Sequence, residues 1–586
     1  MNGWLEYSRR GGHLLPVDGG RRSPGAALRG GREAAILNGV TPSLDLGLTG
    51  GTVADVRAGQ VHRRAVGIRA GRIAAVGADE EIAARSRRVL DLAGAVVVPG
   101  YIEPHGHLLV ASPTEFAAVL LRHGTTTAAV DALPLMMLAR PDRLEGVLEH
   151  LAALPMKFRW LIRLHPQSFT DGDGRFAPGR LRALWRRPWA AGVGEVTRWF
   201  DVVLGDPQLR ALIRAAREDG RPVEGHAPGA SRDRLAALAA AGITSCHEAV
   251  TASEVRDRLE VGLAAMLRHS SIRPDLPVLL EAVTPRDIAS GRVMLTADGP
   301  TPAFIARAGY LDHLARIAMD RGVSPLDALR MITYNPARYY GWDDLGEVAV
   351  GARADLNVLA DLREPTPLVV ISAGEVAVRD GRVLVPLPPP DWTGVFETPP
   401  IPHLAPQALA CPPGRVGLRL SNDVITDLLP PDAVPPGALH LALVDRRGRW
   451  ITRARLAGCA DRLGGLATTL TSGFEPVAVL GSDPEDMARA LRRLADLGGG
   501  VVVVEGGAEV FALRVDVGPY SSLTWEEVVE ANRRFNALMR SRGYPFSDPL
   551  FTLLFLTFDA LPWARVTSRG VWDVRRRQVV QPPDPL

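Results

Sequence analysis

Two histidines one residue apart, His105 and His107, end the segment VVVPGYIEPHGH at residues 96–107. Side chains alternate between faces along an extended chain, so both imidazoles point to the same side of the strand. The run before them is β-branched and almost continuous, as in a parallel strand buried on both faces. Barrel enzymes keep their chemistry at the C-terminal ends of such strands. The pair is therefore a candidate chelating site, and a chance pairing of two loop histidines is the alternative.

Further residues that can bind metal end other predicted strands downstream. Glu195 ends the strand in AGVGEVT, His226 ends RPVEGHAPG, His247 ends ITSCHEAV and Asp298 ends RVMLTADGP. The chain has only 13 histidines, so four at strand ends form an ordered set that favours a metal site over a structural role. The predicted metal ligands are His105, His107, Glu195, His226, His247 and Asp298.

These residue types suit a pair of divalent cations. Two metals can share a bridging carboxylate and a bridging hydroxide, because together they lower the pKa of water enough to give a nucleophile near neutral pH. We expect Glu195 to bridge, the first histidine pair to hold one metal, and His226 with His247 to hold the other. Asp298 would contact metal, take the proton of the attacking hydroxide and pass it to the leaving group. The predicted catalytic residues are Asp298 and Glu195, and the sequence assigns no substrate-binding residue.

A carboxylated lysine is the other common bridge in such barrels. The chain has one lysine, Lys157, which lies in an earlier predicted strand. A lysine bridge is therefore nearly excluded, and we expect Lys157 to be a solvated strand end.

The elements that must position these residues alternate between strand and helix over residues 100–341. Alternation over this length is typical of a (β/α)8 barrel, which usually has about 250 residues. Short alternating strands with glycine turns flank the segment at 46–99 and 342–386, which predicts one β-sandwich built from both pieces with the barrel inserted. The predicted fold class is α/β, with a further C-terminal α+β domain.

The remaining segments complete the predicted domain organisation. Residues 1–45 are rich in Gly and Arg, and we expect a disordered tail or a wrongly assigned start of translation. A proline-rich linker is expected at 387–413 and the C-terminal domain at 414–586. That last domain shows no catalytic constellation in its sequence.

Composition excludes several classes of protein. The 586 residues carry a net charge of +3, and 46% are hydrophobic, which is typical of a globular protein without a nucleic-acid partner. No apolar run reaches the roughly 18 residues of a membrane span. Three cysteines and the absence of a signal peptide favour the cytoplasm.

With these residues in place, the chain resembles the adenine deaminase family of the amidohydrolase superfamily. The motifs that carry the resemblance are VVVPGYIEPHGH, SPTEFAAVLLRHGTTT, GVGEVT, RPVEGHAPG, AAAGITSCHE and, in the C-terminal domain, DPEDMARALRRLADLGGGVVVVEGG and SDPLFTLLFLTFDALP. The resemblance implies an amidohydrolase barrel with two divalent metal ions (Mn, Fe or Zn). It also implies a role in purine metabolism, the hydrolysis of adenine to hypoxanthine and ammonia. A purine base is then the expected small-molecule partner, and a homo-oligomer the expected assembly.

The chain also departs from the family pattern at four places. Where the family has His-Ile-Glu-Ser, with a glutamate thought to act as an acid toward the purine, this chain has His107-Leu108-Leu109-Val110. Thr296-Ala297-Asp298 keeps one of two paired aspartates, and Asp131-Ala132-Leu133-Pro134 replaces Asp-Pro-His-Glu. Thr471-Ser472-Gly473-Phe474 replaces Asp-Ser-His-Asn. Apolar replacements cannot hydrogen-bond to a purine edge.

Three functions are therefore open from the sequence. The first is a metal-dependent deaminase of adenine or a close aminopurine. The second is an amidohydrolase of altered specificity that hydrolyses another cyclic amidine or amide, as Leu109 suggests. The third is a catalytically silent homologue with a binding or assembly role.

Overall fold

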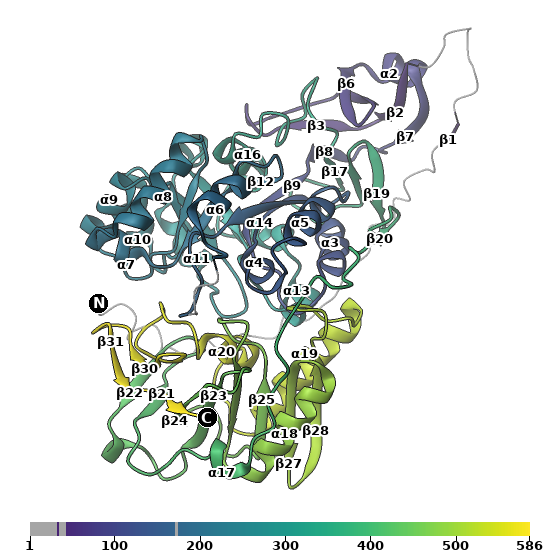
Figure 1. Cartoon of the computed structure of the whole chain (residues 1–586). Coiled ribbons are helices and arrows are strands. Elements are labelled where there is room, and N and C mark those ends of the chain that lie inside the picture. The colour runs from purple at the N-terminus through teal and green to yellow at the C-terminus, as the bar shows by residue number, and fades with distance from the viewer. Residues whose placement is uncertain (1–31, 34–42, 170–173) are drawn as a thin grey trace.

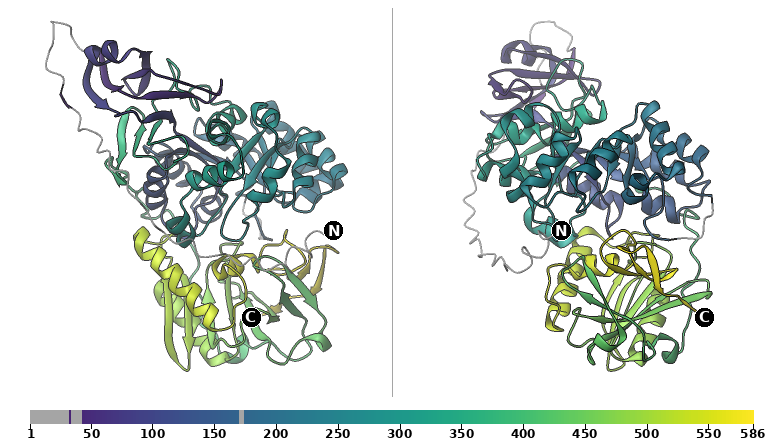
Figure 2. Two further views of the ribbon diagram at one scale, coloured as in Figure 1. Left: turned by 180° about the vertical axis from the view of Figure 1, so that it is seen from behind. Right: turned by 90° about the vertical axis from the view of Figure 1, so that its left-hand side faces the viewer.

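The computed structural model describes residues 32–33, 43–169 and 174–586. A barrel occupies the centre, with small β-sheets at one end and a C-terminal domain against the other (Figure 1). The same arrangement is visible from behind and from the side in Figure 2.

The barrel consists of parallel strands in the order in which they occur along the chain. They are β9 (Tyr101–Gly106), β10 (Thr125–Asp131), β11 (Lys157–Ile162), β12 (Ala190–Val196), β13 (Val223–Gly225), β14 (Ser245–Cys246), β15 (Ala264–Arg268) and β16 (Val293–Thr296). A parallel bridge between Gly106 and Asp298 joins the last strand to the first. The predicted eight-stranded α/β barrel is confirmed.

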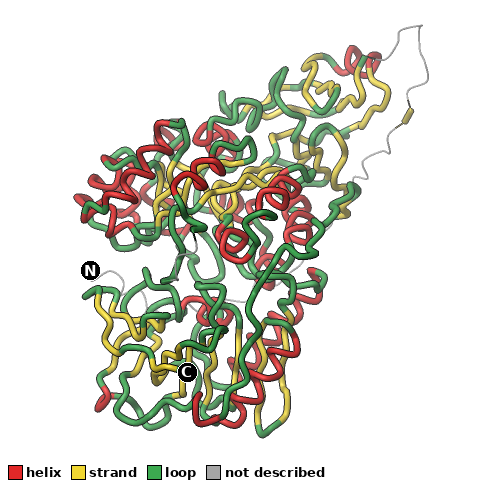
Figure 3. Tube along the Cα trace, in the orientation of Figure 1, coloured by secondary structure: helices red, strands yellow, loops and turns green. Residues whose placement is uncertain are grey.

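Amphipathic helices cover the outside of the barrel (Figure 3). The main ones are α3 (Pro113–Arg122), α5 (Leu144–Ala152), α6 (Pro178–Trp185), α8 (Pro207–Glu218), α9 (Arg232–Ala240), α10 (Ala252–Glu260) and α14 (Leu311–Asp320). The start of α3 shows how sequence fixes such a helix: the Ser112 hydroxyl accepts a hydrogen bond from the Glu115 amide, and Pro113 fills the first position. Its buried face includes Phe116, Leu120 and Leu121.

A seven-stranded sheet combines strands from both sides of the barrel segment. Its order is β20 (Arg382–Val383), β19 (Glu375–Arg379), β18 (Val369–Ser372), β17 (Leu356–Leu359), β8 (Val96–Pro99), β3 (Thr52–Asp55) and β4 (Gln60–His62). Beside it lies a five-stranded sheet of β1 (Arg32–Glu33), β7 (Ser86–Asp91), β2 (Leu44–Thr49), β5 (Ala65–Arg69) and β6 (Arg72–Gly77). Apart from β1 and residues 43–45, the predicted N-terminal tail lies outside the described residues.

Gly100 marks the point where the chain leaves this sheet for the barrel. A Cβ atom at this position would lie 2.3 Å from the Thr126 hydroxyl oxygen, so a side chain would force β9 away from β10. The Pro-Gly break therefore lets one apolar run supply β8 to the sheet and β9, with its histidines, to the barrel.

The C-terminal domain is built on a larger mixed sheet. Its path is β22 (Thr426–Leu429), β21 (Gly417–Leu420), β24 (Trp450–Ala457), β23 (Leu439–Val444), β26 (Val477–Gly481), β25 (Gly465–Thr468), β27 (Gly500–Glu505) and β28 (Ala508–Arg514). Helix α18 (Pro484–Leu497) packs on β25 and β27, and α19 (Trp525–Ser541) lies beside α13 (Pro302–Ala308) of the barrel segment.

Hydrogen bonds fix this domain to the barrel mouth. The Ser168 hydroxyl, in the barrel segment, donates to the Thr557 carbonyl (2.6 Å) and lies 2.8 Å from the Ser472 hydroxyl. The Thr301 hydroxyl donates to Asp548 (2.9 Å). No helix among the described residues is long and apolar enough to cross a membrane.

Candidate metal centre and active site

The two histidines of the first motif face each other at the barrel mouth. His105 is the fifth residue of β9, and His107 follows the strand. Their Nε2 atoms lie 3.2 Å apart, as the alternation of side chains predicts. His105 is fully buried, whereas the side chain of His107 is 22% exposed, so the pair opens toward the cavity on one side only.

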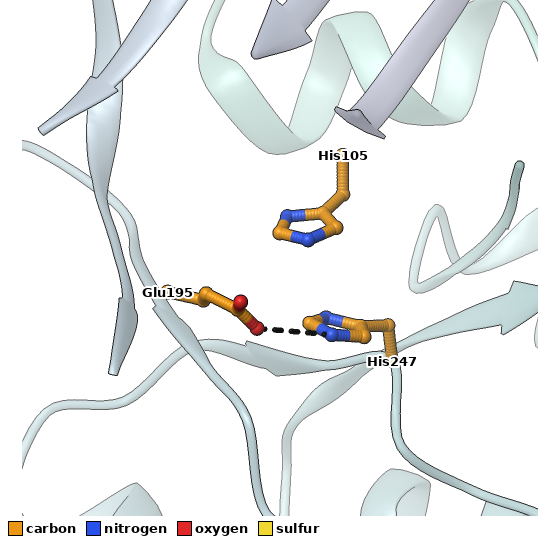
Figure 4. Close-up of side chains that lie close together, drawn as sticks. All are labelled: His105, Glu195 and His247. Carbon is orange, nitrogen blue, oxygen red and sulfur yellow. Dashed lines mark ion pairs between the residues drawn. The ribbon is translucent and has the colours of Figure 1, made fainter. Parts of the chain in front are cut away.

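Glu195, His226 and His247 form a second group beside this pair. Glu195 ends in the mouth from β12, and the two histidines follow β13 and β14. Glu195 Oε2 lies 2.7 Å from His226 Nδ1 and 3.2 Å from His247 Nε2. Figure 4 shows Glu195 and His247 pointing toward one another, with the His105 ring stacked on that of His247 at 4.1 Å between centroids.

Asp298 completes the set from the last strand of the barrel. It lies two residues beyond β16, and its Oδ1 is 3.2 Å from His107 Nε2 and 3.8 Å from His105 Nε2. Its φ of 59° is left-handed, a conformation that aspartate tolerates better than most residues. The structure thus brings together all six residues that the sequence singles out: His105, His107, Glu195, His226, His247 and Asp298.

Carboxylates behind the first two histidines orient their rings. His105 Nδ1 donates to Glu224 (2.6 Å), and His107 Nδ1 lies 3.3 Å from Asp131. Burial lowers the pKa of His105, but the Glu224 carboxylate raises it by more. Each contact leaves Nε2 as the atom that points into the site. Such pairs are typical of metal-binding histidines.

A buried arginine connects the two groups. Arg163 donates to Glu195 Oε1 (2.7 Å) and, through two nitrogens, to both oxygens of Asp131 (3.0 and 2.7 Å). Burial raises the pKa of Glu195, but His226 and Arg163 hold it well below the usual range. Arg163 therefore keeps Glu195 ionised and leaves Oε2 for the histidines. Sequence reasoning missed Arg163 and Asp131, although both lie at strand ends.

Arg268 and Glu248 form a similar support on the other side. Arg268 Nη1 donates to Glu248 Oε1 and to Asp298 Oδ2, both at 2.6 Å. Glu248 Oε1 lies 3.5 Å from both His226 Nδ1 and His247 Nε2. Sequence reasoning also missed Glu248, whose only signal is that it follows His247 directly.

The donor atoms of this cluster fit metal ions. Glu195 Oε2, which faces His226 Nδ1 and His247 Nε2, is buried without a hydrogen-bond partner among the described residues. A carboxylate oxygen that faces imidazole nitrogens without a hydrogen bond is a typical ligand arrangement for a divalent cation. In each of four sets of residues, the donor atoms lie within 4.8 Å of one another. The sets are His105–Glu195–His247, His105–His107–Asp298, His226–His247–Glu248 and His107–Asp131–Glu195.

Comparison with known proteins places this site in a family. Residues 96–377 match the model of the amidohydrolase family, and residues 421–578 match that of the adenine deaminase C-terminal domain. A Halalkalibacterium halodurans protein named "Putative adenine deaminase BH0637" is 34% identical over 520 residues, 84% of this chain and 87% of that protein. The chain belongs to the adenine deaminase family.

The comparisons also found the following similarities. The adenine deaminase of Nitratidesulfovibrio vulgaris is 31% identical over 516 residues, 84% of this chain and 89% of that protein. A solved zinc-bound adenosine deaminase from Xanthomonas campestris is 18% identical and covers 58% of this chain and 94% of its own, with a TM-score of 0.43. As a member of the amidohydrolases, the chain is a hydrolase that acts on C–N bonds.

The one lysine of this chain, Lys157, lies away from the metal-binding residues. Lys157 begins β11, whereas the metal-binding residues lie at or beyond strand ends. Its ammonium group is buried, pairs with Asp355 at 2.8 Å and donates to the Ser372 hydroxyl at 2.8 Å. The prediction of a solvated strand end is wrong, because Asp355 and Ser372 reach Lys157 from the seven-stranded sheet.

The residues that depart from the family pattern lie around a cavity of about 440 Å³. Its walls include the departures Leu109, Pro134, Thr471 and Phe474 together with the metal-binding side chains. The loop after His107 is tied to the C-terminal domain, because Ser521 donates its amide hydrogen to the Val110 carbonyl at 2.6 Å. The C-terminal domain therefore forms part of the active-site wall.

The other histidines and the thiol near the motifs have separate surroundings. His123 pairs with Asp312 at 3.1 Å, and His313 packs edge-on against His269. Cys246 is buried. Arg198 lies 3.4 Å from Asp559 of the C-terminal domain.

Proposed function

We propose that this protein removes the exocyclic amino group of adenine or a close aminopurine by hydrolysis. The reaction converts adenine and water to hypoxanthine and ammonia. One observation carries the proposal: six side chains with nitrogen or oxygen ligand atoms converge from the ends of five barrel strands, and one of them, Glu195, has an Oε2 without a hydrogen-bond partner among the described residues. Relatives named adenine deaminase support the choice of substrate.

Two divalent ions, Mn, Fe or Zn, fit the proposed ligands. His105 and His107, with Asp298, would hold one, and His226 with His247 would hold the other. Glu195 lies within reach of both groups and would bridge them. When bound, such ions lower the pKa of water toward neutrality and supply a nucleophile.

Asp298 is the proposed proton carrier. Burial raises the pKa of its carboxyl, but contacts with His107 and Arg268 hold it well below the usual range, so it is ionised at neutral pH. Oδ2 is held by Arg268, while Oδ1 faces the histidine pair. Oδ1 would accept the proton of the attacking water and pass it to the departing amine.

Arg163 and Glu224 are proposed as positioning residues. Arg163 fixes one oxygen of Glu195, and Glu224 fixes the ring of His105. Neither needs to contact substrate, because each acts through the residue that it orients.

Leu109 and Phe474 favour a second candidate, hydrolysis of another cyclic amidine or amide. Both line the cavity where the family resemblance implies polar groups. An apolar wall leaves a polar purine edge unpaired, which costs a large factor in selectivity.

Ammonia release tests both candidates. The purified protein is reconstituted with Mn, Fe or Zn and assayed against adenine, other aminopurines, cyclic amidines and cyclic amides, with metal content measured on the same sample. Turnover of adenine supports the first candidate. Turnover of another compound alone, with metal bound, supports the second. Metal-loaded protein that turns over nothing, or protein that binds no metal, would contradict both and favour a silent homologue.

Other expectations from the sequence stay predictions. They are the segment boundaries at 46–99, 100–341, 342–386, 387–413 and 414–586, a homo-oligomeric state and a cytoplasmic location.

A further inference from the structure

The C-terminal domain presents one end of its sheet to the cavity. Val444 pairs with Val477, Thr468 with Ala478, and Gly500 with Arg514, so the loops beyond these residues share an edge. Lining residues from these loops are Arg446, Thr469, Leu470, Thr471, Phe474, Gly498 and Val515–Pro519. This edge therefore forms a roof opposite the metal ligands.

Three arginines line the cavity, and they differ in their partners. Arg268 is paired with Glu248 and Asp298, and Arg273 with Asp275 at 2.8 Å. Arg446 has no carboxylate within 4 Å among the described residues, and its one hydrogen bond is donated by Nη1 to the Pro399 carbonyl at 3.2 Å. The roof thus holds a cation that makes no ion pair with a carboxylate of the described residues.

The side chain of Arg446 is partly buried in the cavity wall. Its Nε is buried without a hydrogen-bond partner among the described residues. Burial lowers the pKa of Arg446 to about 10, and the more distant Glu475 only partly offsets this. Nη2 makes no hydrogen bond among the described residues, so it and Nη1 can offer charge-assisted N–H donors to a carboxylate or phosphate in the cavity.

The part of the cavity between the metal ligands and Arg446 has apolar walls, and the cavity is larger than a nucleobase needs. Leu109, Trp392, Phe474 and Phe555 are among the walls, and about 440 Å³ lies within the range of roughly 300–1,000 Å³ typical for drug-sized ligands. Asp516 also lines the roof, but Ser522 donates hydrogen bonds to both its oxygens at 3.0 and 2.9 Å.

From this arrangement we propose that the substrate is an aminopurine or related cyclic amidine that carries an anionic group, a carboxylate or a phosphate, and that Arg446 binds this group. The inference rests on the proposed function for the reacting end of the molecule. It differs in adding a charged subsite on the C-terminal domain, so a free base would fill only part of the cavity.

Matched pairs of compounds test the subsite. The metal-loaded protein is assayed for ammonia release with adenine bearing a short alkyl carboxylate on N9 against its neutral amide, and with adenosine 5′-monophosphate against adenosine. We expect kcat/KM to favour at least one anionic member by about 10- to 100-fold, the range for a charge-assisted hydrogen bond. The preferred pair identifies carboxylate or phosphate as the group that is bound.

Two neighbouring arginines provide the variant and its control. Arg446→Gln should remove the preference for the anionic compounds. Arg446→Lys should keep part of it, because lysine retains the charge but lacks the planar set of N–H donors of a guanidinium. Arg447→Gln should leave it unchanged, because Arg447 is 55% exposed and its nearest carboxylate is Glu475 at 3.8 Å. No preference for the anionic members, or equal effects of Arg446→Gln and Arg447→Gln, would overturn the inference.

Binding separates this inference from the proposed function. Calorimetric Kd values for the same compounds, on wild type and Arg446→Gln, do not require turnover. An anion preference in binding without ammonia release would support the subsite and contradict the deaminase proposal. Turnover of adenine without any anion preference would support the deaminase and overturn the subsite.

Discussion

The two ends of the cavity differ in how their charges are balanced. At the barrel end, the predicted metal ligands lie close to one another, and four of them, Glu195, Asp298, His105 and His107, are held by Arg163, Arg268, Glu224 and Asp131 respectively. At the C-terminal domain, Arg446 stands among apolar side chains without an ion-pair partner among the described residues. The groups proposed for catalysis thus lie at the ends of the barrel strands, whereas the group proposed for substrate recognition lies on the C-terminal domain. Changes at one end should alter metal binding and kcat, and changes at the other the choice of substrate.

The largest loss of activity is expected for a substitution of Glu195, which lies within reach of both pairs of histidines. Glu195→Gln keeps the size of the side chain but removes its charge, so bound metal should fall and ammonia release should drop below detection. Metal analysis and the ammonia assay measure both. His313→Gln is the matched control, because His313 lies on α14 away from the donor sets. Full metal content and activity in Glu195→Gln would contradict its role as a bridge.

The proton carrier should be separable from metal binding. Asp298→Asn keeps an oxygen toward His107 but cannot accept a proton, so kcat should fall by about 10²–10⁴-fold with most of the metal retained. Metal analysis of the same sample distinguishes lost chemistry from lost metal. Undiminished activity in Asp298→Asn or Asp298→Ala would show that another group carries the proton.

The sequence predicted the barrel end much better than the roof. His105, His107, Glu195, His226, His247 and Asp298 lie at strand ends, and a parallel barrel necessarily brings strand ends together. Arg163 and Glu248 obey the same rule but were passed over, because an arginine or a second acidic residue is common at a strand end. Arg446 carried no local signal at all. It reaches the cavity only because the C-terminal domain docks on the barrel mouth, and periodicity does not encode that placement.

A substitution at Leu109, in the barrel loop after His107, should show how the cavity wall affects the choice of substrate. The family resemblance implies a glutamate at this position, and Leu109 lines the cavity. Leu109→Glu should raise kcat/KM for adenine by about tenfold through a restored acid, a cautious share of the 10²–10⁴ typical of acid catalysis. Leu109→Gln supplies the same shape without the acid. Equal rates for the two variants would mean that the leucine is not what limits adenine turnover.

The smallest effect on activity is expected for a substitution of Asp559, at the contact between the barrel and the C-terminal domain. Asp559 is buried between the barrel and the C-terminal domain, 3.4 Å from Arg198, and also faces Arg569 and Asp201. Burial raises its pKa to about 7, although Arg198 and Arg569 act in the opposite direction. The folded state therefore favours the protonated acid more than the unfolded state does.

The sign of the resulting pH dependence follows from that preference. The stabilisation by the protonated acid is fully present below the unfolded pKa of about 4 and is lost as pH rises through about 7, by a few kcal/mol. Asp559→Asn removes the ionisation, so the Tm of the variant should rise relative to that of wild type between about pH 4 and 7. Asp320→Asn, at an exposed position on α14, should follow wild type. Parallel Tm curves for wild type and Asp559→Asn would show that Arg198 keeps Asp559 ionised across this range. The contact between Arg198 and Asp559 would then be an ion pair throughout this pH range, and it would hold the barrel and the C-terminal domain together with the same strength at each pH.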